Sequence, residues 1–211
     1  MTDLTLVVGD RNLSSWSLRP WLALKMAGAD FKEILIRLRQ PATKTDIARY
    51  SPSGRVPVLI HGGCHIWESL AICEYVAELF PGTPLWPEDR RLRAVARSVA
   101  MEMHAGFPEL RKHMPMDVAR RRSDAGRTPE VMADIQRITT LWADCRGQYG
   151  EGGPFLFGAF TIADAMYAPV ATRFMTYAVT LDREAETYVR ALISLPPMQS
   201  WYAAAAAEVA A

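Results

Sequence analysis

The chain has 211 residues, of which 50% are hydrophobic and 22% charged, and its 24 basic and 23 acidic side chains leave a formal net charge of +1. Such a composition is typical of a globular protein with one large or two small domains, and no apolar run reaches membrane-spanning length. The near-zero charge excludes a global field that would attract nucleic acid or an anionic membrane. Because the first residues lack a basic segment followed by an apolar one, we expect a cytoplasmic protein.

The first forty residues predict a strand, a helix and a second strand. Residues 4–8 and 33–38 are apolar runs of strand length, and the segment between them has the composition of a helix that stops near Gly28. A unit of this kind gives two parallel strands with a right-handed crossover. Pro20 is tolerated best in a first helical turn, so we predict that the helix begins with Ser17 as its N-cap.

A hairpin and a second helix follow. Residues 40–54 read as a loop with room for one short helix, and the apolar runs 55–60 and 65–67 surround Gly62-Gly63, which accept the positive φ angles of a tight turn. Apolar positions in residues 69–80 recur at helical spacing. The sheet is therefore predicted to be mixed and four-stranded, in the element order of thioredoxin-like domains.

Strand patterns end after residue 80. Residues 81–87 contain three prolines and one glycine, which predicts a stiff connector between a domain at 1–81 and a second at 88–211. The second domain is predicted to be an all-α bundle, with a long helix over 88–114 bent at Pro108 and further helices over 128–145, 161–177, 182–193 and from 196 onward.

The three cysteines, Cys64, Cys73 and Cys145, are widely spaced and form no Cys-x-x-Cys pair. His61 and His65 flank Cys64, but two histidines and one thiol beside a turn are more often exposed polar residues than metal ligands. The sequence predicts neither a metal site nor a disulfide.

The stretch from Gly9 to Trp21 carries the first candidate for chemistry. Ser14 and Ser15 lie beside a predicted helix N-terminus, where free N–H groups and the helix dipole favour negative charge. Neither serine has a neighbouring base, so each is better suited to donate a hydrogen bond to an anion than to act as a nucleophile. Taken alone, the pair also fits an ordinary helix cap.

Two further short motifs fit the recognition of a small peptide. A cis bond at Val56-Pro57 would turn the backbone of Val56 outward to pair with an extended peptide, although a trans proline at a strand start is the simpler reading. Glu68 and Ser69 lie where a strand gives way to a helix, so an ammonium and a carboxylate could be bound together there. A plain serine cap explains Ser69 equally well.

The fourth motif is structural. Phe160-Thr161-Ile162-Ala163-Asp164 has the form of a capping box, with Thr161 at the cap and Asp164 three residues later. We expect these side chains to satisfy N–H groups at the start of a helix.

Together, the serine loop Ser14-Ser15-Trp16-Ser17-Leu18-Arg19, the segments 55–59 and 68–72 and the capping motif resemble the cytosolic glutathione S-transferase superfamily over nearly the whole chain. The serine loop is most similar to the zeta class and related bacterial members, whose pattern is Ser-Ser-Cys-Ser-x-Arg. Trp16 replaces that cysteine, a departure that counts against zeta-type isomerase activity.

The resemblance implies glutathione as co-substrate, no metal, a homodimer and a hydrophobic electrophile as second substrate. It implies that Ser14 or Ser15 hydrogen-bonds the sulfur, with Ser14 favoured, and that Val56 beside a cis Pro57 pairs with the cysteinyl part. Glu68 and Ser69 would hold the γ-glutamyl end, with Arg55 and Lys44 as looser candidates for the glycyl carboxylate. The candidates for the electrophile pocket, each of which fits core packing as well, are Trp16, Met103, His104 and Phe107.

Two alternatives stay open at this stage. One is glutathione-dependent cis-trans isomerisation of a maleyl-type acid, which needs a further basic contact for a dicarboxylate. The other is a non-catalytic ligand carrier of the same fold, which would need neither the loop serines nor the Glu68-Ser69 pair.

Overall fold

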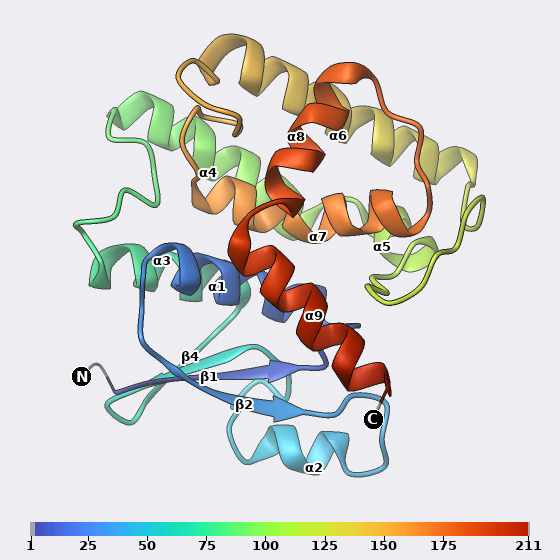
Figure 1. Ribbon diagram of the computed structural model, residues 1–211. Coiled ribbons are helices and arrows are strands. Elements are labelled where there is room, and N and C mark those ends of the chain that lie inside the picture. The colour runs from blue at the N-terminus through green and yellow to red at the C-terminus, as the bar shows by residue number, and fades with distance from the viewer. Residues whose placement is uncertain (1–2, 211) are drawn as a thin grey trace.

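The computed structural model describes residues 3–210. Within that range a four-stranded sheet lies at one end of the molecule and most of the helices at the other (Figure 1). The strands are β1 (Leu4–Gly9), β2 (Lys32–Ile36), β3 (Val58–His61) and β4 (Cys64–Trp67). The helices are α1 (Ser15–Met26), α2 (Thr43–Ala48), α3 (Ser69–Leu79), α4 (Arg90–Ala105), α5 (Pro108–His113), α6 (Pro129–Tyr149), α7 (Ile162–Thr176), α8 (Arg183–Ile193) and α9 (Pro196–Ala210).

The sheet is mixed, as predicted. Its strand order is β2-β1-β3-β4, with β1 parallel to β2 and the other two pairs antiparallel. The tight turn between β3 and β4 places Gly62 and Gly63 at φ angles of 55° and 81°, which glycine adopts without steric cost.

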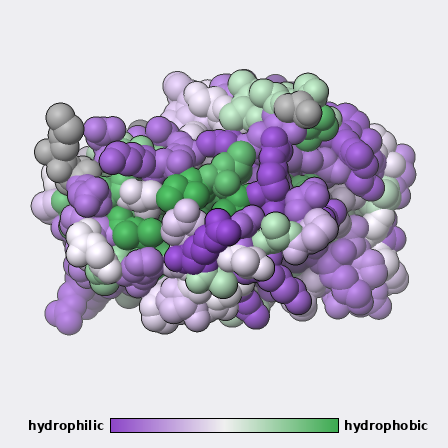
Figure 2. All heavy atoms as spheres, turned by 90° about the horizontal axis from the view of Figure 1, so that it is seen from below, coloured by the Kyte–Doolittle hydropathy of each residue, from purple (hydrophilic) through white to green (hydrophobic). Residues whose placement is uncertain are grey.

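Helices cover both faces of the sheet unequally. Helices α1 and α3 lie between the sheet and the remaining helices, whereas α2 lies alone on the opposite face (Figure 1). Successive residues of β1 point to opposite faces, so Leu6 joins the large core and Val7 joins a small one with Ile47 of α2 and Val58. Seen from the sheet end, the surface is mostly hydrophilic around a smaller apolar area (Figure 2).

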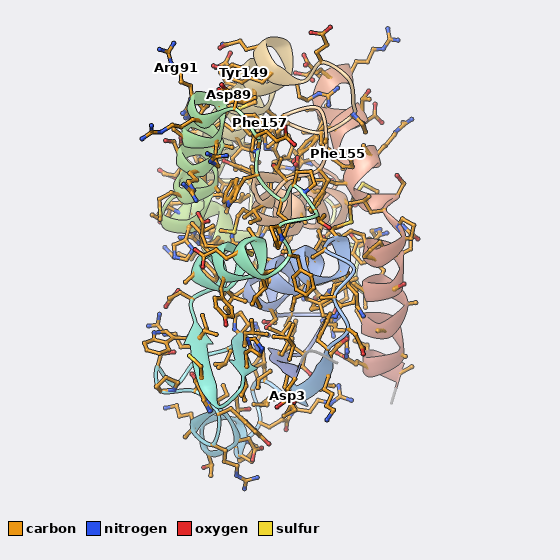
Figure 3. The ribbon with its side chains drawn as sticks, turned by 90° about the vertical axis from the view of Figure 1, so that its left-hand side faces the viewer. Asp3, Asp89, Arg91, Tyr149, Phe155 and Phe157 are labelled. Carbon is orange, nitrogen blue, oxygen red and sulfur yellow. The ribbon has the colours of Figure 1, made fainter. Side chains whose placement is uncertain are left out.

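Helix α7 forms the centre of the helical half. Of its 15 residues only Met175 is substantially exposed, and its Tyr167 and Phe174 rings pack against Trp142 of α6. Figure 3 shows Tyr149, Phe155 and Phe157 at the end of this half, far from Asp3 at the sheet. The chain thus combines a thioredoxin-like α/β unit with an all-helical unit; among the described residues no helix is long and apolar enough to cross a membrane.

Two helix boundaries were predicted wrongly. Ser14, not Ser17, is the N-cap of α1, because its Oγ accepts the N–H of Ser17, and Pro20 therefore lies inside the helix. Proline raises the cost of an earlier start by removing one hydrogen bond but does not forbid it. The Ser17 hydroxyl instead accepts the N–H of Gly9 and joins the helix to the end of β1.

The helix predicted over 88–114 is also interrupted rather than bent. α4 ends at Ala105, Phe107 adopts a left-handed conformation with φ 57°, and Pro108 begins α5 as its first residue. Because a residue before proline disfavours the helical region, Phe107 breaks the helix instead of curving it.

Candidate functional site

A cavity of about 400 Å³ opens between the sheet unit and the helical unit. Its wall combines the loop before β3, the junction of β4 with α3, the first turn of α1 and the end of α4. The lining residues are Trp16, Ser53, Arg55, Val56, Pro57, Glu68, Ser69, His104 and Ala105. Short motifs that are far apart in the sequence therefore meet at one place.

The junction of β4 with α3 has polar groups left open toward this cavity. Glu68 has φ 67° and ψ 122°, a conformation that costs energy for a residue with a side chain. Ser69 is the first residue of α3, and its Oγ is buried without a hydrogen-bond partner. A buried hydroxyl and a helix N-terminus beside an exposed carboxylate suit a ligand that carries both a carboxylate and an ammonium group.

The Val56-Pro57 peptide bond is cis. Val56 lies two residues before β3, outside the strand ladder, and the pairing of β3 with β1 begins only at Val58. The backbone ahead of it is fixed by Ser51, whose Oγ accepts the N–H of Arg55 at 3.1 Å. Val56 thus lines the cavity just ahead of β3, outside the strand ladder.

The two loop serines differ in their hydrogen bonds. Ser14 Oγ accepts the N–H of Ser17 at 3.3 Å and donates its own proton to Ser17 Oγ at 2.8 Å. Ser15 Oγ accepts from Nη2 of Arg173 at 3.2 Å. Both side chains are buried, next in sequence to the cavity wall at Trp16. The Ser14 hydroxyl is committed to the helix cap, whereas the Ser15 hydroxyl is bound through its oxygen.

Distant parts of the chain hold the loop that precedes these serines. Arg11 binds Glu208 of α9 through its backbone N–H and its guanidinium, and it also pairs with Glu33 of β2. The Asn12 side chain donates to Asp117 and accepts the N–H of Ala119. Figure 1 shows α9 running from the helical half alongside the sheet to this region. The position of the loop is therefore fixed by both halves of the molecule.

Positive charge gathers around the Trp16 ring. The guanidinium carbon of Arg19 lies 4.2 Å from the ring centroid, and that of Arg111 lies 5.6 Å from it. Arg19 is fully buried, and none of its three side-chain nitrogens has a hydrogen-bond partner among the described residues. Burial, together with Arg173 and Arg111, lowers the pKa of Arg19 to about 9, so the group remains charged at neutral pH.

His104 lies between Trp16 and Glu68 in the cavity wall. Its ring meets the edge of Trp16 at a centroid distance of 5.4 Å, and its Nε2 lies 3.7 Å from Oε2 of Glu68. Burial, and then the charge of Arg19, lower the pKa of His104. The imidazole is therefore mostly neutral at pH 7, and it leaves the Glu68 carboxylate available to a ligand.

The remaining predicted residues lie outside the cavity. Met103 is fully buried and Phe107 nearly so, while Lys44 is exposed on α2. No sequence motif marks Ser53, Ala105, Arg111 or Arg173 as a site residue. The one available signal was Arg19, a charged residue inside an otherwise apolar helical run. Among the described residues no group of three or more His, Cys, Asp or Glu side chains is placed to hold a metal ion.

Comparison with known proteins gives concordant results. Residues 13–79 match the family model described as glutathione S-transferase, N-terminal domain, and residues 93–204 match the C-terminal domain of the same family. A probable maleylacetoacetate isomerase of Caenorhabditis elegans is 28% identical over 169 residues, which are 78% of this chain and 77% of that protein. Glutathione S-transferase Z2 of Arabidopsis thaliana is 27% identical over 74% of this chain and 72% of its own.

A solved structure of a glutathione transferase homologue from Burkholderia, which contains bound glutathione, superposes with a TM-score of 0.71. It is 23% identical and covers 97% of this chain and 98% of its own, so it supports the same fold.

Proposed function

Because the chain belongs to the glutathione S-transferase family, we propose that its cavity binds glutathione and that a loop serine stabilises the thiolate for attack on an electrophilic small molecule. The observation that carries this proposal is the open start of α3. The unpartnered Ser69 hydroxyl and the Glu68 carboxylate offer complementary groups for the α-amino acid end of a γ-glutamyl peptide.

The rest of the cavity suits the remainder of glutathione. The main chain of Val56, which lies outside the strand ladder, would pair with the cysteinyl residue as one strand pairs with another. Arg55 is a lining residue with a positive charge for the glycyl carboxylate, whereas Lys44 on α2 lies outside the wall and would act only at longer range. This arrangement would direct the sulfur toward Trp16 and the start of α1.

The free energy needed for thiol activation is modest. An unperturbed thiol has a pKa of about 8.5, and a decrease of about two units corresponds to roughly 2.7 kcal/mol of preferential interaction with the anion. One hydrogen bond to a charged group contributes about 1.5–3 kcal/mol, and a helix N-terminus adds about 0.3–1 kcal/mol. A single hydroxyl at the start of α1 is therefore sufficient.

The reaction then needs no group beyond these. The thiol proton passes to solvent, and the sulfur lone pair forms a carbon–sulfur bond with an electrophilic carbon. Either a leaving group departs with its bonding electrons, or the carbanion formed at a double bond takes a proton from water. Trp16 and His104 provide the wall for the second substrate, whereas Met103 and Phe107 are buried in the core.

Calorimetric titration with glutathione, followed by conjugation of a model aromatic electrophile, tests the proposal. We expect saturable binding and turnover, a large loss of kcat in Ser15→Ala, and a smaller loss in Ser14→Ala through the helix cap. If both variants conjugate at the wild-type rate, the loop serines do not activate the thiol. If the wild-type protein does not bind glutathione, it is a carrier for other ligands.

A second candidate is glutathione-dependent cis-trans isomerisation of a maleyl-type acid. It is favoured by the positive charge of Arg19, Arg111 and Arg173 beside the cavity, and by the names of several relatives. Glutathione would add reversibly to the double bond, allow rotation and leave unchanged. An assay with a cis dicarboxylic acid separates the two, since conjugation consumes glutathione and isomerisation does not.

We also propose that the protein is a cytoplasmic homodimer, as family membership suggests. Light scattering of the purified chain gives the mass of the assembly directly, and a monomeric mass at micromolar concentration would contradict this part of the proposal.

A further inference from the structure

Ser15 and Ser14 differ in where their hydroxyl protons are directed. The Ser14 proton is donated to Ser17, whose oxygen also accepts the N–H of Gly9, so it belongs to a chain of bonds inside the helix start. Ser15 accepts from Arg173, and a guanidinium can only donate. The Ser15 proton therefore cannot point toward Arg173 and is available to an acceptor on another side.

Arg173 is itself rigidly held. It lies on α7 with 2% of its surface exposed, its Nε donates to the carbonyl of Met114 at 2.9 Å, and its Nη1 donates to that of Pro169 at 3.2 Å. Two carbonyl acceptors fix the plane of the guanidinium and leave Nη2 for Ser15. Although burial lowers the pKa of Arg173 to about 10, the group is protonated at neutral pH and remains a donor.

We propose that Arg173 is a positioning residue that, by donating to Ser15 Oγ, directs the Ser15 hydroxyl proton toward the glutathione sulfur. This inference rests on the proposed function and deepens it. It assigns thiol activation to Ser15 rather than Ser14, and it places the residue that orients the hydroxyl in the helical half, 158 positions further along the chain. The thiolate is then stabilised by a hydroxyl whose oxygen is already polarised by a cation.

Arg173 could also act on the thiolate through space, as a charge alone. Arg19 provides the contrast, because it is buried and charged but has no hydrogen bond to either loop serine among the described residues. A positioning role requires Ser15 as intermediary, whereas a field effect does not. The two mechanisms therefore differ in whether substitutions at 173 and 15 have additive effects.

A double-mutant cycle on the apparent pKa of bound glutathione tests the inference, with the thiolate absorbance band followed against pH at saturating glutathione. The variants are Ser15→Ala, Arg173→Gln and the two combined. We expect each single variant to raise the apparent pKa by about one unit, so that at a pH below both values the thiolate fraction falls about tenfold. The double variant should raise it no further than Ser15→Ala alone. Additive shifts, or no shift in Arg173→Gln, would overturn the inference.

Matched variants separate positioning from stability. Arg127→Gln removes an arginine that donates to the carbonyls of Tyr177 and Ala178, just after α7, without touching the loop, so it should leave the pKa unchanged. Arg173→Lys keeps a donor and should recover part of the shift. If the Arg173 variants do not fold, Ser14→Ala and Ser15→Ala decide, since a larger shift in Ser14→Ala contradicts the inference. Failure of the wild-type protein to bind glutathione would instead refute the proposed function.

Discussion

Two helix starts in this protein differ in whether their buried polar side chains have hydrogen-bond partners. At the start of α7, the Asp164 carboxylate accepts from the N–H groups of Leu156 and Thr161 and from the hydroxyls of Thr161 and Tyr188. At the start of α3, Ser69 Oγ has no partner and Glu68 is held at a positive φ. At the start of α7 the buried polar groups bond to one another, so this helix start contributes to the stability of the fold. The second leaves a buried group open, and this makes it the candidate for ligand binding.

The largest expected effect of a substitution is therefore at Asp164. Asp164→Ala leaves buried N–H and hydroxyl groups without an acceptor, and we expect a loss of about 3–5 kcal/mol in the free energy of unfolding. Urea denaturation measures it. Asp182→Ala is the matched control, since the exposed Asp182 caps α8 through one bond to Ala185 and should cost about 1 kcal/mol. Equal losses at both sites would remove the contrast between the two helix starts.

The pH dependence of stability provides a second test of α7. Burial raises the pKa of Asp164 to about 6, above the value of about 3.9 in the unfolded chain, so between these values the folded state binds more protons. The contribution of this group to stability therefore increases as pH falls from 7 toward 4, by at most about 3 kcal/mol. Unfolding of wild-type protein and Asp164→Asn, compared across this range, should show the difference. Parallel pH profiles would contradict the assignment.

The opposite outcome is expected at α3. Ser69→Ala removes a hydroxyl that has no hydrogen-bond partner among the described residues, so stability should change by less than about 1 kcal/mol. The affinity for glutathione should fall about 10- to 100-fold, because a hydrogen bond to a charged group contributes about 1.5–3 kcal/mol. Calorimetry measures both the stability and the glutathione affinity of Ser69→Ala. Ser98→Ala, on an exposed face of α4, is the control. A loss of stability without a loss of affinity would make Ser69 an ordinary cap residue.

The smallest expected effect on stability concerns Arg19, a second unpartnered buried group. Arg19→Met removes a buried charge that contacts the Trp16 ring and has no hydrogen-bond partner among the described residues, so the free energy of unfolding should stay within about 1 kcal/mol of wild type or rise. Thermal unfolding measures it. A destabilisation of several kcal/mol would mean that Arg19 has a structural role comparable to that of Asp164.

The sequence predicted what depends on local chemistry. The glycine turn at 62–63 and the helix starts near residue 128 and at Thr161 were predicted correctly because their residue types act on neighbours within a few positions. The start of α1 at Ser14 was missed because the prediction relied on Pro20, whereas the Ser14 hydroxyl caps the helix with Pro20 inside it. The break at Phe107 was missed because the apolar periodicity continues beyond Ala105, whereas the residue before Pro108 disfavours the helical conformation.

The residues of the candidate site likewise include some that local motifs predicted and some that they did not. Seven predicted residues line the cavity, because each belongs to a short motif at the end of a strand or helix: Trp16, Arg55, Val56, Pro57, Glu68, Ser69 and His104. Arg111 and Arg173 were not foreseen. They reach Trp16 and the serine loop from α5 and α7, which are distant in sequence, and no local pattern marks such contacts.

A crystal structure with bound glutathione would show whether α3 is the ligand-binding helix start. We expect the γ-glutamyl carboxylate within hydrogen-bond distance, about 3 Å, of Ser69 Oγ, and the ammonium group facing Glu68. Glutathione bound elsewhere, or bound in this cavity with Ser69 Oγ still unpartnered, would contradict the assignment of α3 as the ligand-binding helix start.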